Sequence, residues 1–237
     1  MLGENVFWDG QTLTKIDVRS EMEQPNNNTG KQEAKILEQN GEGVVYFDDR
    51  TGRVVDAGYH VWTMDYRGFG ESKGDVSENR VLGDANMVYE EILKTEQIDI
   101  IWGRSFGFGI ATYLASTKSP KRLVLETPYW SLPDAAGYTR PFLLSSLFRY
   151  RLPTNEYLEY VQCPVHIIHG TADEKIDFES STRLDELCRK FHLQGKLHEI
   201  SGGKHNFRPS KSKPMQTDAA FETALKESLD LKFETSR

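Results

Sequence analysis

The sequence has 237 residues, of which 38% are hydrophobic and 27% charged, and its net charge is −7. The length suits one folded domain. Basic residues are interspersed among the acids without a basic stripe, so nucleic acid is not an expected partner. There is no apolar run of about 18 residues and no signal-peptide pattern at the N-terminus, so no membrane association is expected of this chain.

The numbers and spacing of cysteines and histidines further narrow the class of protein and the kinds of site that it could contain. Two cysteines, Cys163 and Cys188, are too few for a disulfide framework. We expect both to be reduced, which is typical of a cytoplasmic protein. The six histidines show no HxxxH spacing and the cysteines no CxxC spacing, so no metal site is expected.

Apolar and amphipathic segments alternate along the chain. The first residues have β propensity, and 21–33 has the composition of a loop. The segments that we expect to be strands are 43–47, 60–66, 99–103, 122–127, 165–170 and 196–201. The segments that we expect to be helices are 79–96, 105–116, 178–191 and 219–231. This order predicts an α/β fold whose mostly parallel sheet is covered by helices on both faces. The apolar run 43–47 in particular is typical of a strand buried within such a sheet.

One serine lies in a run of glycines where a strand leads into a helix. Gly103-Arg104-Ser105-Phe106-Gly107 matches G-x-S-x-G in the required context of strand, sharp turn and helix. The motif holds the serine hydroxyl above the sheet, and a Cβ two residues away would collide with neighbouring backbone. The alternative is a glycine-rich turn without chemistry. The helix N-terminus after the serine favours developing negative charge.

A serine needs a base and an orienting acid to act as a nucleophile. Asp173 follows the expected strand 165–170, and His205 follows the strand 196–201, in the chain order serine, acid, histidine. Glu174 or Asp177 could compete for the role of the acid. His169 is interpreted as a structural hydrogen-bonding residue at a strand end.

From GVVYF to the C-terminus, the chain resembles small-lid serine hydrolases of the α/β-hydrolase superfamily, of the esterase-like or serine-aminopeptidase-like group. The segments that carry the resemblance are DYRGFGES, GRSFGFGIATYLA, ETPYWSLPD, CPVHIIHGTADE and GGKHNF. The resemblance implies an eight-stranded, mostly parallel sheet in a single domain, 1–237, with a lid at 128–160. It also implies that Ser105 is the nucleophile, His205 the base and Asp173 the acid. The N–H of Phe106 would be one oxyanion donor, and no cofactor is expected.

The chain departs from the family pattern after Phe47. Relatives continue with a His-Gly-rich turn, which supplies a second oxyanion donor, and then a full helix. Here only the nine residues 48–56 follow, which is short for a crossover connection, and Asp48 stands at the donor position. The missing residues could be absent from this sequence, the helix could be truncated, or the site could be degraded. The first explanation is preferred because the flanking strands are intact.

The lid suggests an acyl pocket. Four apolar residues near or within it are candidates to line the pocket: Tyr129, Trp130, Phe142 and Leu143. The alternative is that they pack the lid onto the sheet. We therefore expect a serine hydrolase that cleaves a carboxylic ester of a small-molecule acyl substrate through an acyl-enzyme, with a thioester or peptide substrate as alternatives. The rival hypothesis is a non-catalytic or weakly active binding protein with this fold.

Overall fold

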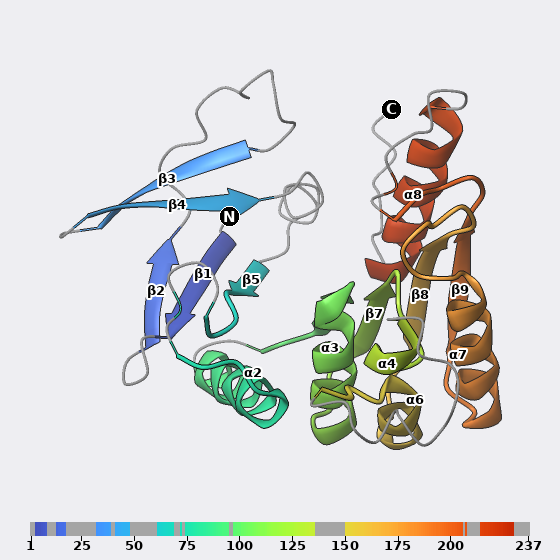
Figure 1. Ribbon diagram of the computed structural model, residues 1–237, viewed down its shortest axis with the longest axis horizontal. Helices are drawn as coiled ribbons and strands as arrows, with labels where there is room; N and C mark the ends of the chain where they lie inside the picture. Colours follow the sequence, from blue (N-terminus) through green and yellow to red (C-terminus); the bar gives the residue numbers. More distant parts are fainter. Residues whose placement is uncertain are drawn as a thin grey trace. The chain divides into compact units, whose positions relative to one another are not determined.

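The computed structural model forms two compact units, Met1–Val76 and Ser77–Arg237. The residues that it describes are 3–8, 13–17, 32–38, 41–47, 61–68, 72, 74–94, 97–135, 150–205, 207 and 214–229. Within these residues, the first unit contains strands and the second unit contains a parallel sheet with helices (Figure 1).

The described strands of the first unit form two small sheets. Strand β1 (Gly3–Trp8) pairs antiparallel with β2 (Leu13–Asp17) and parallel with β5 (Val61–Met64). Strand β3 (Gln32–Glu38) pairs antiparallel with β4 (Gly41–Phe47).

A strand is found where the run 43–47 predicts one, but its described pairing is antiparallel and not parallel. The pairing partner, β3, begins at Gln32, at the end of the segment expected to be a loop. An apolar run cannot tell the two kinds of pairing apart, and strands close in sequence form antiparallel hairpins readily.

The second unit is built on four parallel strands in the order β6-β7-β8-β9. These are β6 (Ile100–Arg104), β7 (Arg122–Glu126), β8 (Val165–Gly170) and β9 (Gly195–Ile200). Each lies within about one residue of its predicted segment. The predicted α/β fold with a parallel sheet and flanking helices is therefore confirmed, with four parallel strands in the described part of this unit.

The helices of this unit overlap the predicted segments. The longer ones are α2 (Glu78–Leu93), α3 (Phe106–Thr117), α7 (Glu179–Lys190) and α8 (Pro214–Leu229). Helix α8 begins at Pro214 and not at 219, and α2 ends at Leu93 and not at 96. The described part of the lid contains the short helices α4 (Leu132–Ala135) and α6 (Thr154–Tyr157) and the 3-10 turn η1 (Leu158–Tyr160). Helix α2 begins where the side chain of Ser77 accepts the N–H of Arg80, which satisfies one of the donors at the helix start.

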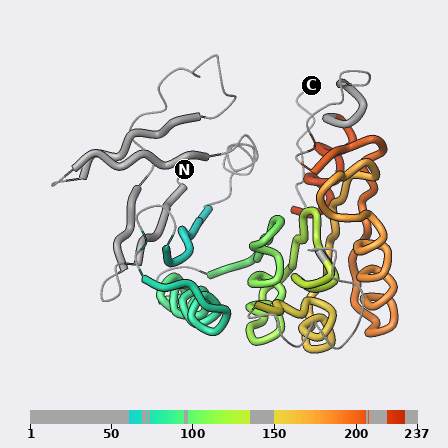
Figure 2. The backbone as a smooth tube through the Cα atoms, viewed as in Figure 1, coloured from blue at the N-terminus to red at the C-terminus, as the bar shows by residue number. Residues whose placement is uncertain are grey.

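The sheet is covered on both faces. Three consecutive residues of β7, Leu123, Val124 and Leu125, are completely buried, although successive side chains of a strand point to opposite faces. Helix α7 lies on the face of β8 that carries His169, which contacts α7 through a side-chain hydrogen bond. Helix α8 lies on the other face, where its residue Glu227 is next to His198 of β9. The chain can be followed through β8, α7 and β9 in Figure 2.

The ends of the four strands are held in a row by backbone hydrogen bonds that continue past the strands themselves. The N–H of Ser105 donates to the carbonyl of Glu126 at 3.1 Å, and the N–H of Thr127 donates to that of Ile168 at 2.9 Å. The N–H of Thr171 donates to the carbonyl of Ile200 at 3.0 Å. This edge, the carboxyl edge of a parallel sheet, is where ligand sites form in such folds.

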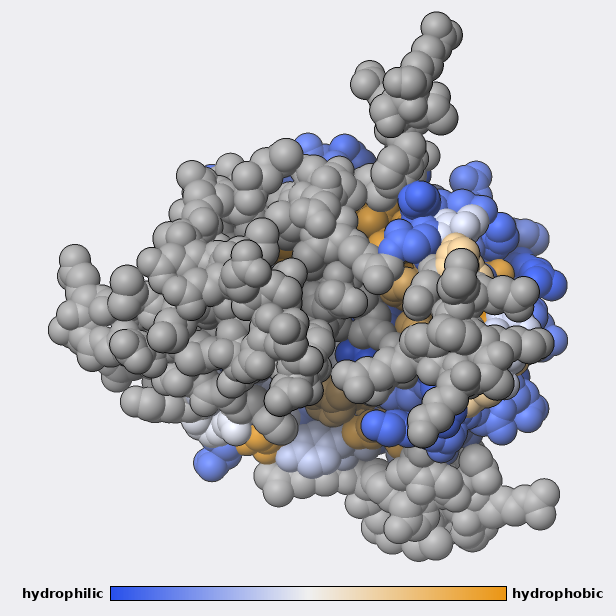
Figure 3. Space-filling model, turned by 90° about the horizontal axis from the view of Figure 1, so that it is seen from above, coloured by the Kyte–Doolittle hydropathy of each residue, from blue (hydrophilic) through white to orange (hydrophobic). Residues whose placement is uncertain are grey.

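On the face seen in Figure 3, the described residues that are visible are mostly hydrophilic, with smaller apolar patches among them. Among the described large apolar side chains, only Leu93 and Tyr160 are exposed. None of the described helices combines the length and the hydropathy that a bilayer crossing requires. Cys163 and Cys188 are buried free thiols, and burial raises their pKa values to about 11 and about 12, respectively.

Two histidines on the α8 face of the sheet share a hydrogen bond. His166 Nδ1 lies 3.1 Å from His198 Nε2, and their rings are stacked. The pKa of His198 is lowered from 6.5 to about 4, mainly by burial and also by His166 and Lys196, whereas Glu227 opposes the change. The folded protein therefore resists protonation at His198.

This lowered pKa predicts a loss of stability in mild acid. As the pH falls from about 6.5 to about 4, the unfolded chain takes up a proton at His198 and the folded chain does not, so the free energy of unfolding decreases. We expect His198→Gln to remove on the order of 2 kcal/mol of this pH dependence, measured by urea unfolding at pH 7 and pH 4.5. His192→Asn, at an exposed histidine, is the control. Equal pH dependence in His198→Gln and the wild type would contradict the prediction.

Candidate active site

Ser105 occupies a strained backbone conformation between β6 and α3. Its φ is 48° and its ψ is −120°, a region that residues with a side chain rarely adopt. The side chain makes no capping bond to the helix that follows. The backbone is fixed instead by the hydrogen bond to Glu126 and by the N–H of Phe108, which donates to the Ser105 carbonyl at 3.2 Å.

Glycine is required at position 103, two residues before Ser105, because neighbouring atoms leave no room for a Cβ. A Cβ on Gly103 would lie 2.3 Å from the Cα of Phe108 and 2.5 Å from the Cβ of Ala111. The strand that leads to the serine therefore passes directly against the helix that leaves it. This close approach is the steric reason that the sequence suggests for the motif.

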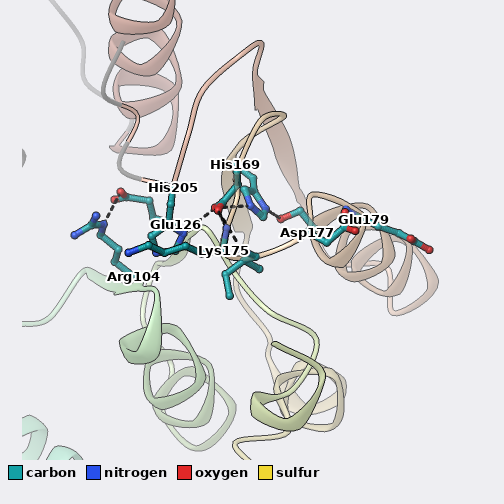
Figure 4. Close-up of polar contacts among 10 residues, drawn as sticks. Arg104, Glu126, His169, Lys175, Asp177, Glu179 and His205 are labelled. Atoms are coloured by element: carbon teal, nitrogen blue, oxygen red, sulfur yellow. Dashed lines mark hydrogen bonds and ion pairs between the residues drawn. The ribbon is translucent and has the colours of Figure 1, made fainter. Parts of the chain in front are cut away.

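An ion pair lies beside this turn. The Nε of Arg104 is 3.0 Å from Oε1 of Glu126, whose side chain is completely buried at the end of β7 (Figure 4). The pair links the residue before the serine to the residue whose carbonyl accepts the serine N–H. The sequence motifs do not identify Glu126, although an acid at the end of the apolar strand RLVLE is a visible signal.

Asp173 and His205, which are 32 residues apart in sequence, are in direct contact. His205 Nδ1 lies 2.8 Å from Oδ2 of Asp173, and both side chains are buried. An ionised carboxylate only accepts hydrogen bonds, so Nδ1 of His205 carries the proton and Nε2 of the neutral ring keeps its lone pair. Such a ring can accept a proton at Nε2.

The Asp173 carboxylate receives three further hydrogen bonds. Oδ1 accepts the backbone N–H groups of Lys175 at 2.8 Å and Ile176 at 3.0 Å. Oδ2 also contacts Nε2 of His169 at 3.0 Å (Figure 4). Burial alone would raise the pKa of Asp173, but the hydrogen bonds from His169, the two N–H groups and His205 hold it well below its usual value. Asp173 is therefore ionised throughout the neutral range.

The loops that carry Asp173 and His205 meet through backbone contacts. A Cβ on Gly170 would lie only 2.1 Å from the carbonyl oxygen of Gly203. The N–H of Ala172 donates to that carbonyl at 2.9 Å, and the N–H of Gly202 donates to Oγ1 of Thr171 at 2.9 Å. Glycine at position 170 thus lets the two loops approach closely enough for the acid and the histidine to bond.

Two of the predicted pocket residues, Tyr129 and Trp130, differ in burial and in contacts. Tyr129 is buried, packs edge-on against Phe108 with ring centroids 3.9 Å apart, and donates its hydroxyl to the carbonyl of Phe106 at 3.3 Å. This placement favours the alternative that Tyr129 packs the start of the lid onto α3. Trp130 is partly exposed, and the guanidinium of Arg183 lies 4.0 Å from the centre of its ring.

Several sequence predictions fall on residues outside the described ranges. Asp48, the whole connection 48–56, Phe142 and Leu143 belong to this group. Of the competing acids, Glu174 and Asp177 are exposed, whereas the side chain of Asp173 is buried. The described residues contain no group of three or more His, Cys, Asp or Glu side chains that could hold a metal ion.

The close approach of Gly170 and Gly203 predicts a sensitive position. Gly170→Ala should push the two loops apart and lower the free energy of unfolding by about 2 kcal/mol, measured by urea denaturation. The resonance of the His205 Nδ1 proton should be lost, because the hydrogen bond to Asp173 opens.

The matched control is Gly83→Ala in α2, where a Cβ would meet nothing within 4 Å. Alanine in a helix interior should stabilise the protein by about 0.5–1 kcal/mol. If Gly170→Ala keeps both the wild-type stability and the His205 proton resonance, the loops are not held together by this contact.

Comparison with known proteins places this chain in a family. A family model described as serine aminopeptidase, S33, matches residues 40–158. The lysophosphatidylserine lipase ABHD12 of Danio rerio is 30% identical over 179 residues, which cover 65% of this chain and 44% of that protein. The same lipase of Gallus gallus is 30% identical over 191 residues, covering 69% and 46%. The chain spans less than half the length of these curated relatives.

Solved structures agree on the fold. A butyrate-bound esterase from Thermogutta terrifontis matches with a TM-score of 0.58 and 18% identity, covering 76% of this chain and 74% of that chain. An acylaminoacyl peptidase from Pyrococcus horikoshii matches with a TM-score of 0.62 and 14% identity, covering 100% and 43%. At these identities, the likeness establishes the fold alone.

Proposed function

Because the chain belongs to the serine aminopeptidase S33 family of α/β-hydrolases, we propose that it hydrolyses a carboxylic ester or a related acyl bond. The observation that carries this proposal is the 2.8 Å hydrogen bond between His205 Nδ1 and Asp173 Oδ2. Asp173 and His205 lie at the same edge of the sheet as Ser105, which is held in a strained strand-to-helix turn. In the proposed site, Ser105 is the nucleophile, His205 the general base and Asp173 the orienting acid.

The first step transfers a proton and forms a bond. Ser105 Oγ attacks the substrate carbonyl carbon while its proton passes to Nε2 of His205. Asp173, ionised at neutral pH, stabilises the imidazolium that results. The N–H of Phe106, at the positive end of the α3 dipole, would donate to the oxyanion. Asp48 is the proposed position of the second donor.

The second half of the reaction regenerates the serine. The imidazolium of His205 gives its proton to the leaving group, and an acyl-enzyme on Ser105 remains. A water that donates a proton to His205 then attacks the acyl carbon, and His205 returns this proton to Ser105 Oγ as the acid is released. The reaction as proposed needs no cofactor.

We propose a small-molecule acyl ester as the substrate. One finding favours an ester over a thioester or a peptide: relatives of this chain are named as lysophosphatidylserine lipases. The apolar composition of the lid, residues 128–160, agrees with an acyl group as ligand. The eight-stranded sheet and the single domain 1–237 are proposed on the family resemblance, and a cytoplasmic location on the free cysteines.

A second candidate function is supported by the short connection after Phe47. Losing one oxyanion donor typically lowers kcat by about 10²–10³-fold, and Asp48 at that position would repel the oxyanion. The chain would then be a weakly active or non-catalytic binding protein of the same fold. Reaction of the serine with an active-site probe separates the two functions.

Labelling with a fluorophosphonate tests the nucleophile. We expect the folded wild-type protein to be labelled at pH 8 and Ser105→Ala to stay unlabelled, because the probe reacts only with an activated serine. Ser116→Ala, at the other end of α3, is the matched control and should be labelled like the wild type. A folded wild type that remains unlabelled would overturn the hydrolase proposal and favour the binding protein.

Hydrolysis of p-nitrophenyl acetate tests the base. His205→Ala removes the proton acceptor, and we expect the rate to fall by about 10²–10⁴-fold. His192→Asn, which changes an exposed histidine just after α7, should leave the rate unchanged. A decrease of less than about threefold in His205→Ala would mean that another residue is the base.

A further inference from the structure

A second histidine binds the same oxygen of Asp173 as His205 does. His169, in β8, is completely buried, and its Nε2 lies 3.0 Å from Asp173 Oδ2. Its other ring nitrogen, Nδ1, lies 2.6 Å from Oγ of Ser181, which is also completely buried, in α7. A chain of contacts thus runs from α7 through β8 to the carboxylate that holds His205.

The direction of these hydrogen bonds follows from their acceptor. An ionised carboxylate has no proton to give, so Nε2 of His169 carries the hydrogen and donates to Asp173. The neutral ring then has a lone pair at Nδ1, and the hydroxyl of Ser181 donates to it. The serine thereby selects the ring tautomer that places the N–H toward Asp173.

On this basis we infer that His169 and Ser181 are positioning residues for the Asp173–His205 pair. The inference rests on the proposed function of that pair. Oδ1 is fixed by two backbone N–H groups, so the orientation of the carboxylate is set on that side. On the Oδ2 side, His169 and His205 share one oxygen, and the strength of one bond affects the other.

Because His169 and His205 share Oδ2 of Asp173, His169 affects the protonation of His205, the proposed base. The N–H of His169 disperses negative charge that would otherwise face His205. Removing it concentrates the charge on Oδ2 and favours the protonated form of the His205 ring. Since only the neutral ring can take the proton of Ser105, the reaction would then need a more alkaline medium.

The packing around His169 indicates that its ring is held in place. The ring of Phe178, at the start of α7, lies with its centroid 5.5 Å from that of His169. The N–H of Ser181 donates to the carbonyl of Phe178 at 3.0 Å, which fixes the serine in the first turn of the helix. A rigid donor of this kind orients the carboxylate before substrate binds.

The test is the pH profile of fluorophosphonate labelling. We expect the midpoint of the acid limb to rise by about half to one pH unit in His169→Leu and by less in Ser181→Ala, because losing or weakening the His169 hydrogen bond leaves more negative charge on Oδ2 of Asp173, which favours the protonated form of His205. His169→Gln retains an N–H donor and should restore most of the wild-type midpoint. Ser180→Ala is the matched control, because it removes the neighbouring buried hydroxyl of α7.

A purely structural role would give a different result. It would lower the amount of protein that reacts without moving the midpoint, and would rank the variants by their stability and not by the donors they retain. An unchanged midpoint in both His169→Leu and Ser181→Ala would therefore overturn the inference.

Nitrogen-15 spectra of the histidine rings give a readout that does not depend on activity. We expect His169 to carry its proton on Nε2 in the wild type and to populate both tautomers in Ser181→Ala. A His169 ring protonated on Nδ1 alone in the wild type would contradict the inference, even if Ser105 is labelled. If the wild type is not labelled but the spectra show the expected tautomers, the proposed function fails and the positioning of Asp173 stands.

Discussion

Four hydrogen bonds to one buried carboxylate hold the candidate site together. Removing a carboxylate from water costs several kcal/mol, and each hydrogen bond to a charged group returns about 1.5–3 kcal/mol. For Asp173, hydrogen bonds from β8, from its own loop and from the loop after β9 offset this desolvation cost. All of these segments must be in position at once for the charge to be stable. The geometry of the site is therefore coupled to the packing of the strands beneath it.

The serine side of the site depends on backbone strain. A non-glycine residue at φ 48° costs about 1–3 kcal/mol, and the surroundings of Ser105 must impose it. The contact of Gly103 with α3 and the hydrogen bond from Ser105 to Glu126 do so on both sides of the turn. The ion pair between Arg104 and the buried Glu126 further ties β6 to β7. Contacts of β6 with α3 and with β7 thus hold Ser105 in its strained conformation.

Local sequence patterns predicted the parts of this protein that depend on local chemistry. The alternation of apolar and amphipathic segments located β6 to β9 and the helices between them within a few residues. The sequence also singled out Asp173 and His205, which the fold brings into contact.

Contacts between distant segments could not be predicted in this way. The partner of His169 is Ser181, a serine with no distinctive pattern, which becomes significant only once α7 packs on β8. Tyr129 looked like a pocket residue because it is aromatic and near the lid, but burial against α3 depends on the direction in which the chain leaves β7. The antiparallel pairing of β4 likewise depends on its partner.

The direction in which the chain leaves β7 also matters for the proposed chemistry. Ser105 follows β6, whereas Asp173 and His205 follow β8 and β9, so the end of β7 lies between the nucleophile and its base. Thr127, the residue after β7, has a φ of 51°, which is unusual for a β-branched residue. The turn at Thr127 sends the chain toward α3, where Tyr129 packs against Phe108. Because the chain turns from the sheet edge toward α3 there, we expect the imidazole of His205 and the hydroxyl of Ser105 to meet above the end of β7 during the proposed reaction.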